Sequence, residues 1–100
     1  MLEYIRKTRE NQDNLNKEIN YRNRIRKIME NLNEKLIWIE KTLENLEKST
    51  CDSLYNFKNS LREEERKIIN SIENLELDIH YSTIRINYYT EICNSAITTG

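Results

Sequence analysis

Residues 25–46, IRKIMENLNEKLIWIEKTLENL, decide the fold. Their apolar side chains recur in alternating steps of four and three residues, at Ile25, Met29, Leu32, Leu36, Ile39, Leu43 and Leu46. This spacing places the side chains on one stripe of an α-helix and is typical of a coiled-coil seam. The stretch therefore predicts a long helix that packs lengthwise against a second helix.

The second half of the chain carries a matching series of positions. From residue 61 the same alternation continues, with two polar interruptions, through Leu61, Glu65, Ile68, Ile72, Leu75, Ile79, Ser82, Ile86, Tyr89 and Cys93. Two such stripes in one chain can cover each other at a small cost in loop-closure entropy. We therefore expect the two helices to fold back on each other as an antiparallel hairpin.

The composition favours the same fold class. The chain has 100 residues, no proline and one glycine, Gly100, and its net charge is −1. Folds with sheets need many turns, which favour glycine and proline. The sequence thus predicts an all-α, coiled-coil-like helical hairpin as a single domain over residues 1–100, with helices at about 3–47 and 54–95 and a turn at about 48–53.

The turn is expected within residues 48–60. The segment 47–56 contains four residues whose short side chains can cap a helix N-terminus, namely Ser49, Thr50, Asp52 and Ser53. The spacing of Ser60 and Glu63 fits a capping box and would start the second helix later. Because the segment lacks glycine and proline, one uninterrupted helix is the alternative. A bend near residue 50 would place position i opposite about 100 − i, with Leu43 near Phe57.

The two arms of this hairpin are unequal at the end that carries the termini. Residues 7–23, KTRENQDNLNKEINYRN, contain few apolar side chains, yet they face the apolar segment 77–93. Besides its seam, that segment carries a second row, here called the tyrosine stripe: Leu77, Tyr81, Ile84, Tyr88 and Ile92. Exposed apolar patches mark interaction sites, and tyrosine is a favoured interface residue. We expect the tyrosine stripe to bind a helical protein partner.

Two alternatives concern the apolar residues outside the seam. The tyrosine stripe could instead belong to a wider internal core, covered by Tyr4, Ile5, Leu15, Ile19 and Tyr21. Trp38 flanks the seam, so it either edges the core or forms a hot spot for a partner. We include Trp38 among the interface candidates.

No arrangement of residues indicates catalysis. His80 is the one histidine and is expected to pack beside the seam or at its rim. Cys51 and Cys93 lie far apart on the expected helices, beyond disulfide reach, and give no metal-ligand spacing. We therefore predict a protein that is not an enzyme, with no catalytic, cofactor-binding or metal-binding residues.

Nucleic acid and membranes are not the expected partners. Residues 21–28, YRNRIRKI, are basic, but we interpret them as a solvated helix face and keep an RNA-binding hairpin as a remote alternative. No apolar run approaches the roughly 20 residues that a membrane-spanning helix needs. The first residues lack the apolar core of a signal peptide. We expect a cytoplasmic protein that is exported, if at all, in complex with a partner and without a signal peptide.

One stretch carries a family resemblance. Phe57 is followed by the charged run REEER at residues 62–66, then by heptads and the pair Tyr88 and Tyr89. With the hairpin layout, this resembles the small helical proteins of Gram-positive type VII secretion, which include WXG-type (Esx-like) proteins and the helical partners of LXG toxins. The Trp-x-Gly turn is absent, since Trp38 is followed by Ile39 and Glu40.

The resemblance implies a function in delivery. Proteins of this group pair as helical hairpins or bind the helical N-terminal region of a toxin. It implies that this chain is a chaperone-like accessory that targets an LXG-type toxin for type VII secretion, with any export signal on another subunit. The alternative from the heptads alone is a self-associating structural protein, a homodimeric coiled coil or four-helix bundle.

Overall fold

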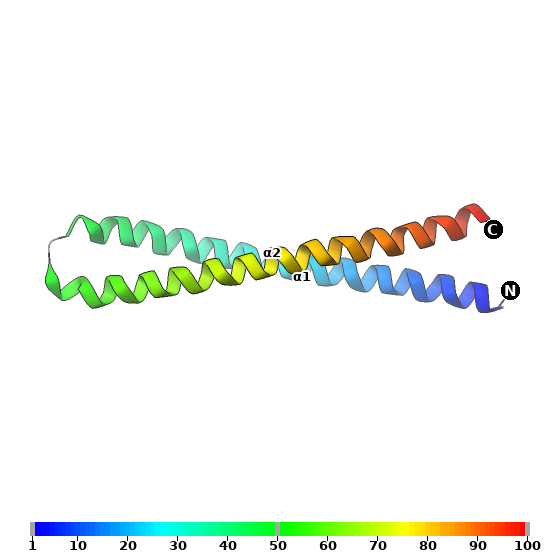
Figure 1. The fold of residues 1–100 in the computed structure, drawn as a ribbon, viewed down its shortest axis with the longest axis horizontal. Helices are drawn as coiled ribbons and strands as arrows, with labels where there is room; N and C mark the ends of the chain where they lie inside the picture. Colours follow the sequence, from blue (N-terminus) through cyan, green and yellow to red (C-terminus); the bar gives the residue numbers. More distant parts are fainter. Residues whose placement is uncertain (1, 50, 100) are drawn as a thin grey trace. The chain divides into compact units, whose positions relative to one another are not determined.

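The computed structural model describes the backbone of residues 2–49 and 51–99 and the side chains of residues 2–49 and 51–95. Helix α1 spans Leu2–Glu47 and helix α2 spans Tyr55–Thr99, with a short 3-10 helix, η1, at Asp52–Leu54 between them. The helices run in opposite directions as a helical hairpin (Figure 1). The predicted all-α hairpin is therefore confirmed, and the alternative of one uninterrupted helix is wrong.

The helix bounds differ from the expected ones mainly at the C-terminal end. Helix α1 ends at Glu47, and α2 begins at Tyr55 and continues to Thr99 rather than ending near residue 95. The sequence offers no glycine or proline before Gly100. Nothing in the backbone therefore stops α2 earlier.

The turn between the helices forms without glycine or proline. Its backbone N–H groups bond locally: Ser49 donates to the Leu46 carbonyl over 3.0 Å and Leu54 to the Cys51 carbonyl over 3.2 Å. Cys51 N–H donates to Ser49 Oγ over 3.3 Å, and Lys58 Nζ donates to the Ser49 carbonyl over 3.3 Å. Every described residue keeps a negative φ, so ordinary side chains fit the turn.

The chain divides into two compact units, a subdivision that the single-domain prediction does not contain. The turn unit comprises Lys27–Glu76. Its seam positions form one apolar cluster, in which Ile39, Leu43, Leu61 and Ile68 are buried and Leu32, Leu36, Leu46 and Ile72 pack around them. The turn unit therefore has the continuous apolar seam that the heptads predict.

The register within the turn unit is close to the expected one, because Lys35 Nζ donates to Glu64 Oε1 over 3.0 Å and position 35 was expected opposite about 65. Leu43 belongs to the cluster with Leu61, whereas Phe57 keeps 46% of its surface exposed. Phe57 therefore lies outside the buried cluster that contains Leu43, and the expected proximity of these two residues stays a prediction.

The terminal unit comprises Met1–Arg26 and Leu77–Gly100. On α2 its seam follows the predicted positions, and Ser82, Ile86 and Cys93 are buried. On α1 the seam continues from Ile25 toward the N-terminus in the same steps, through the partly buried Arg22, Glu18, Leu15, Asn11 and Thr8. Only one of those five side chains is apolar. The seam positions of α1 therefore follow the same steps of four and three in both units, but they are apolar in the turn unit and mostly polar in the terminal unit.

Candidate interaction surface

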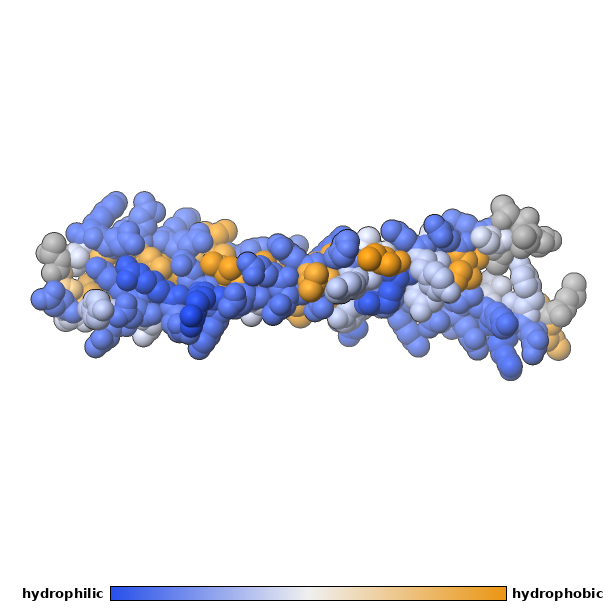
Figure 2. Space-filling model, viewed as in Figure 1, coloured by the Kyte–Doolittle hydropathy of each residue, from blue (hydrophilic) through white to orange (hydrophobic). Residues whose placement is uncertain are grey.

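The tyrosine stripe lies on the surface of α2 in the terminal unit. Leu77, Tyr81, Ile84 and Tyr88 keep 51%, 51%, 52% and 60% of their surface exposed, while Ile92 is partly buried. Figure 2 shows apolar side chains emerging at several places on a mainly hydrophilic surface. Half-exposed Leu, Ile and Tyr in a continuous row are unusual for a surface that faces only water.

The tyrosine stripe and the seam occupy nearly opposite sides of α2. At about 100° per residue, the centre of the stripe lies about 140° from the centre of the seam. The first four stripe residues are spaced by four, three and four residues, which is the seam rhythm repeated on the outer side. The C-terminal half of α2 therefore offers apolar rows to two neighbours, and α1 occupies one of them.

The two tyrosines of the stripe contact the aromatic rings of neighbouring residues. Tyr88 packs edge to face against Tyr89, with ring centroids 5.4 Å apart, and Tyr89 is partly buried on the seam side. His80 is exposed, and its ring lies 6.0 Å from that of Tyr81. His80 therefore lies exposed beside the stripe, not packed against the seam. These contacts restrict the tyrosine rings, which lowers the entropy lost when a partner covers them.

A polar layer lies in the seam between the two helices of the terminal unit, on the side of α2 away from the stripe. We define it as Glu18 and Arg22 of α1 with Ser82, Thr83 and Arg85 of α2. Glu18 accepts a 2.9 Å hydrogen bond from the wholly buried Ser82 hydroxyl and a 2.5 Å bond from Arg85 Nε. Arg22 Nη1 donates to Thr83 Oγ1 over 3.4 Å, and its buried Nε has no partner among the described residues.

The electrostatics of the layer centre on Glu18. Burial alone would raise its pKa, but the hydrogen bonds from Arg85 and Ser82 and the charge of Arg85 outweigh burial, so the pKa lies below the ordinary 4.5. The same hydrogen bond raises the pKa of Arg85. Both groups are charged at neutral pH. Polar contacts join α1 to α2 in this layer, whereas in the turn unit an apolar cluster joins them together with the ion pairs Lys35–Glu64 and Arg62–Glu47.

The sequence analysis missed Glu18 and Arg22 as seam residues. Ser82 was recognised as a polar interruption of the second seam, but its partner on α1 was not. The signal was available, because extending the steps of four and three backward from Ile25 leads to Arg22 and then Glu18. Seam positions are usually identified by apolar residues, so two charged ones are easily overlooked.

The internal core proposed as an alternative does not form. Tyr4, Ile5 and Tyr21 remain 47%, 55% and 37% exposed, and only Leu15 and Ile19 are partly buried. The first helix therefore does not cover the tyrosine stripe.

Trp38 lies apart from the stripe residues in the chain. It belongs to α1 in the turn unit, 59% of its surface is exposed, and its carbonyl accepts a 2.7 Å hydrogen bond from Thr42 Oγ1. That exposure argues against a place at the edge of the core. Trp38 therefore stays a candidate contact of its own.

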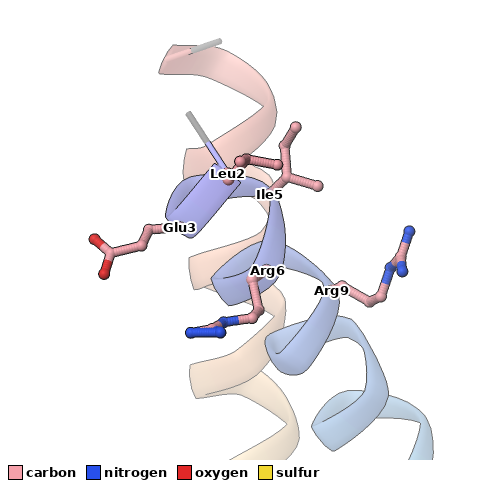
Figure 3. A pocket seen from close by; sticks show the side chains of 5 residues that line it. All are labelled: Leu2, Glu3, Ile5, Arg6 and Arg9. Atoms are coloured by element: carbon pink, nitrogen blue, oxygen red, sulfur yellow. The ribbon is translucent and has the colours of Figure 1, made fainter.

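A surface depression near the N-terminus lacks the features of an active site. Leu2, Glu3, Ile5, Arg6 and Arg9 line it, all from the first turns of α1 (Figure 3). Figure 3 shows the Glu3, Arg6 and Arg9 side chains splayed outward rather than converging. Catalysis needs groups that meet around one reacting atom. The prediction that the protein is not an enzyme rests on this reasoning and stays a prediction.

Other expected sites can be compared with the structure. Cys51 is exposed, Cys93 is buried, and both are free. Within the described ranges, no three His, Cys, Asp or Glu side chains gather closely enough to hold a metal ion.

Over the same part of the chain, neither helix has the length of apolar sequence needed to cross a bilayer. Residues 21–28 form exposed helix surface apart from Arg22 and Ile25.

Comparison of the chain with family models, curated proteins and solved structures gives no significant match. The function therefore has to be argued from the surface itself.

Proposed function

We propose that this protein is a non-enzymatic helical binding protein that packs the tyrosine stripe of α2 against a helix of a partner protein. The observation that carries the proposal is the half exposure of Leu77, Tyr81, Ile84 and Tyr88 in a row with heptad spacing. A partner helix with its own apolar seam would bury these side chains as α1 buries the other side of α2.

The composition of the terminal unit supports a partner at this place. Its α1 arm contributes charged and polar side chains to the seam, and the buried Nε of Arg22 in its polar layer has no hydrogen-bond partner among the described residues. Polar seams specify register at a cost in stability. Burying the tyrosine stripe would add apolar contact at an end of the hairpin where α1 supplies few apolar seam residues, and binding would stabilise the folded chain.

The specific form of the proposal is a chaperone-like accessory in type VII secretion. The partner is then the helical N-terminal region of an LXG-type toxin, and the complex, rather than the chain alone, is recognised for export. This form is supported by the resemblance of the hairpin layout and of residues 57–66, FKNSLREEER, to small helical secretion proteins.

Co-expression tests both levels of the proposal. The full chain is purified with the N-terminal helical region of an LXG-type toxin from the same genome, and the complex is measured by light scattering. We expect a defined complex with the unaltered chain and none with the variant Ile84→Glu/Tyr88→Glu. The matched control is Asn59→Glu/Asn70→Glu, which adds the same two charges at exposed positions of α2 in the turn unit.

Each outcome has a distinct meaning. Binding by the Ile84→Glu/Tyr88→Glu variant would refute the stripe as the interface. Loss of its helicity by circular dichroism would show that these side chains serve the internal packing instead. If the unaltered chain ignores the toxin region, the secretion form of the proposal fails.

A second candidate is a self-associating structural protein, a homodimeric four-helix bundle. The heptad spacing of the stripe would also fit the same stripe of a second copy, which is the observation behind this candidate. A tight dimer with a sharp thermal transition that no partner dissociates would support the structural candidate. A chain that is weakly stable alone and is stabilised by a partner would support the accessory.

A further inference from the structure

We infer that the partner helix lies along a groove between α1 and α2 beside the tyrosine stripe and carries acidic side chains on the edge that faces α1. The inference rests on the proposed function, because it takes the partner to be a helix that covers the stripe. It adds a second wall to the binding site, contributed by α1, and the charge that the partner needs there.

One groove of the terminal unit, here called the flank groove, is lined by both helices. Its lining residues are Asn14, Lys17, Glu18, Tyr21 and Arg24 of α1 and Tyr89 of α2. Tyr21 is 37% exposed and Tyr89 is partly buried, so two phenol rings offer apolar surface within the groove. The flank groove therefore combines aromatic and charged side chains, and α1 supplies most of them.

The flank groove is continuous with the tyrosine stripe. Tyr89 of the groove packs edge to face against Tyr88 of the stripe, with ring centroids 5.4 Å apart. Arg85, which donates to Glu18 across the groove, lies four residues after Tyr81 and three before Tyr88. Residues at these spacings are neighbours on one side of a helix. Because a helix with its side chains is about 10–12 Å wide, one that packs on both stripe tyrosines would also cover the groove and contact α1.

Lys17 and Arg24 make the α1 wall of the flank groove positive. They lie seven residues apart on the same side of α1, and both are exposed. Neither forms an ion pair with any residue that the structure describes. Glu18 is the one carboxylate among the lining residues, and Arg85 already neutralises it. The lining therefore keeps two positive charges without a counter-charge.

Other carboxylates on the same sides of the helices lie farther along the axes. Glu10 precedes Lys17 by one heptad, and Asp78 precedes Arg85 by one heptad. One heptad is about 10 Å, which is also about the Debye length at physiological salt. Within the described part of the chain, Glu10 and Asp78 form no ion pairs. The flank groove therefore attracts carboxylates of a partner and repels a basic helix.

An amphipathic helix fits this surface better than a nucleic acid does. Leu77 and Ile84, at the outer edge of the stripe, offer aliphatic side chains, which pack against an apolar helix face but give bases no ring to stack on. Two unpaired cations would neutralise about two phosphates, far fewer than the roughly 6–10 phosphate contacts that give strong, salt-sensitive binding. The surface is therefore best filled by a helix with an apolar face and an acidic edge.

Two designed peptides test the charge of the partner. Both have the same leucine seam at heptad positions a and d, but one carries Glu and the other Lys at all e and g positions, so neither pairs with itself. Binding of the labelled peptides to the full chain is measured by fluorescence anisotropy at low salt. We expect the acidic peptide to bind at least about tenfold more tightly than the basic one, and this preference to shrink as salt is added.

Charge reversal locates the preference in the flank groove. The variant Lys17→Glu/Arg24→Glu should lose the preference for the acidic peptide while keeping its helicity by circular dichroism. The matched control is Lys27→Glu/Lys41→Glu, which makes the same change of charge at exposed positions of α1 in the turn unit and should keep the preference.

Each result either supports the inference or overturns it. Equal binding of the two peptides by the unaltered chain, which needs no substitution, would overturn it, as would an unchanged preference in Lys17→Glu/Arg24→Glu. Binding of an oligouridylate as tight as that of the acidic peptide would overturn the helix as the partner class. If the toxin region binds and the peptides show no preference, this inference fails alone. If the chain binds neither the peptides nor the toxin region, the proposed function fails with it.

Discussion

Removing the Glu18 carboxylate should destabilise the terminal unit, because the buried hydroxyl of Ser82 would lose its hydrogen-bond acceptor. Glu18→Ala deletes the acceptor of the 2.9 Å bond from Ser82, whose side chain is 0% exposed, and of the bond from Arg85. A hydroxyl left buried without a partner costs about 1–3 kcal/mol. The ion pair with Arg85, which is partly solvated, adds less than about 1 kcal/mol. We expect the free energy of unfolding to fall by about 1.5–3 kcal/mol.

The measurement is urea unfolding followed by far-UV circular dichroism at low protein concentration. Glu10→Ala is the matched control, because Glu10 lies exposed on the outer side of the same helix, and it should change stability by less than about 0.5 kcal/mol. The double variant Glu18→Ala/Ser82→Ala removes the orphaned hydroxyl as well. This double variant should recover about 1 kcal/mol or more of the lost free energy of unfolding, because removing both hydrogen-bonding partners destabilises a protein less than leaving one of them buried and unpaired.

Acid provides a second readout of the same contact. The folded-state pKa of Glu18 lies below its ordinary 4.5, so its contribution is fully present above that pH and is lost as pH falls through the folded pKa. The stability difference between the unaltered chain and Glu18→Ala should therefore shrink in acid. The reasoning is refuted if Glu18→Ala behaves like Glu10→Ala at neutral pH, or if adding Ser82→Ala recovers nothing.

Two further predictions concern the turn unit and the thiols. Ile39→Ala should cost about 2–5 kcal/mol, because Ile39 is 1% exposed in the apolar cluster, whereas Ile37→Ala, 51% exposed, should stay within about 0.5 kcal/mol in thermal unfolding. Equal losses would contradict the seam. A disulfide thiol reagent should label Cys51, whose pKa is lowered by its hydrogen bond with Ser53, at least about tenfold faster than the buried Cys93. Similar rates in the folded chain would mean that the seam around Cys93 opens readily.

Part of the candidate surface was predictable because helix periodicity is a local property. Once residues 61–93 are assigned to a helix, the steps between Leu77 and Tyr88 place those side chains away from the seam, whatever else the chain does. Their exposure agrees with that expectation. Ile92 fits less well, since it lies nearer the seam and is partly buried.

Contacts between the arms were less accessible to sequence reasoning. The register depends on how many residues the turn uses, and several segments within residues 48–60 could have formed it. The structure places Leu43 and Leu61 in one buried cluster, as their seam positions predict, and leaves Phe57 46% exposed outside it. A shift of one heptad, about two helical turns, keeps every seam residue in the seam, so periodicity alone cannot choose among such registers.

By itself, the sequence determined two long helices, the seam on each and the surplus apolar row of α2, because these follow from the 3.6-residue period of the backbone. Only the tertiary structure decided which atoms of Glu18, Ser82 and Arg85 bond across the hairpin, that Tyr4 and Tyr21 leave the tyrosine stripe uncovered, and that the contacts divide into two units. Those outcomes depend on which residues face one another across a distance of many residues in the chain. That choice is set by the turn length and by the pairing of buried polar groups, neither of which leaves a repeating mark in the sequence.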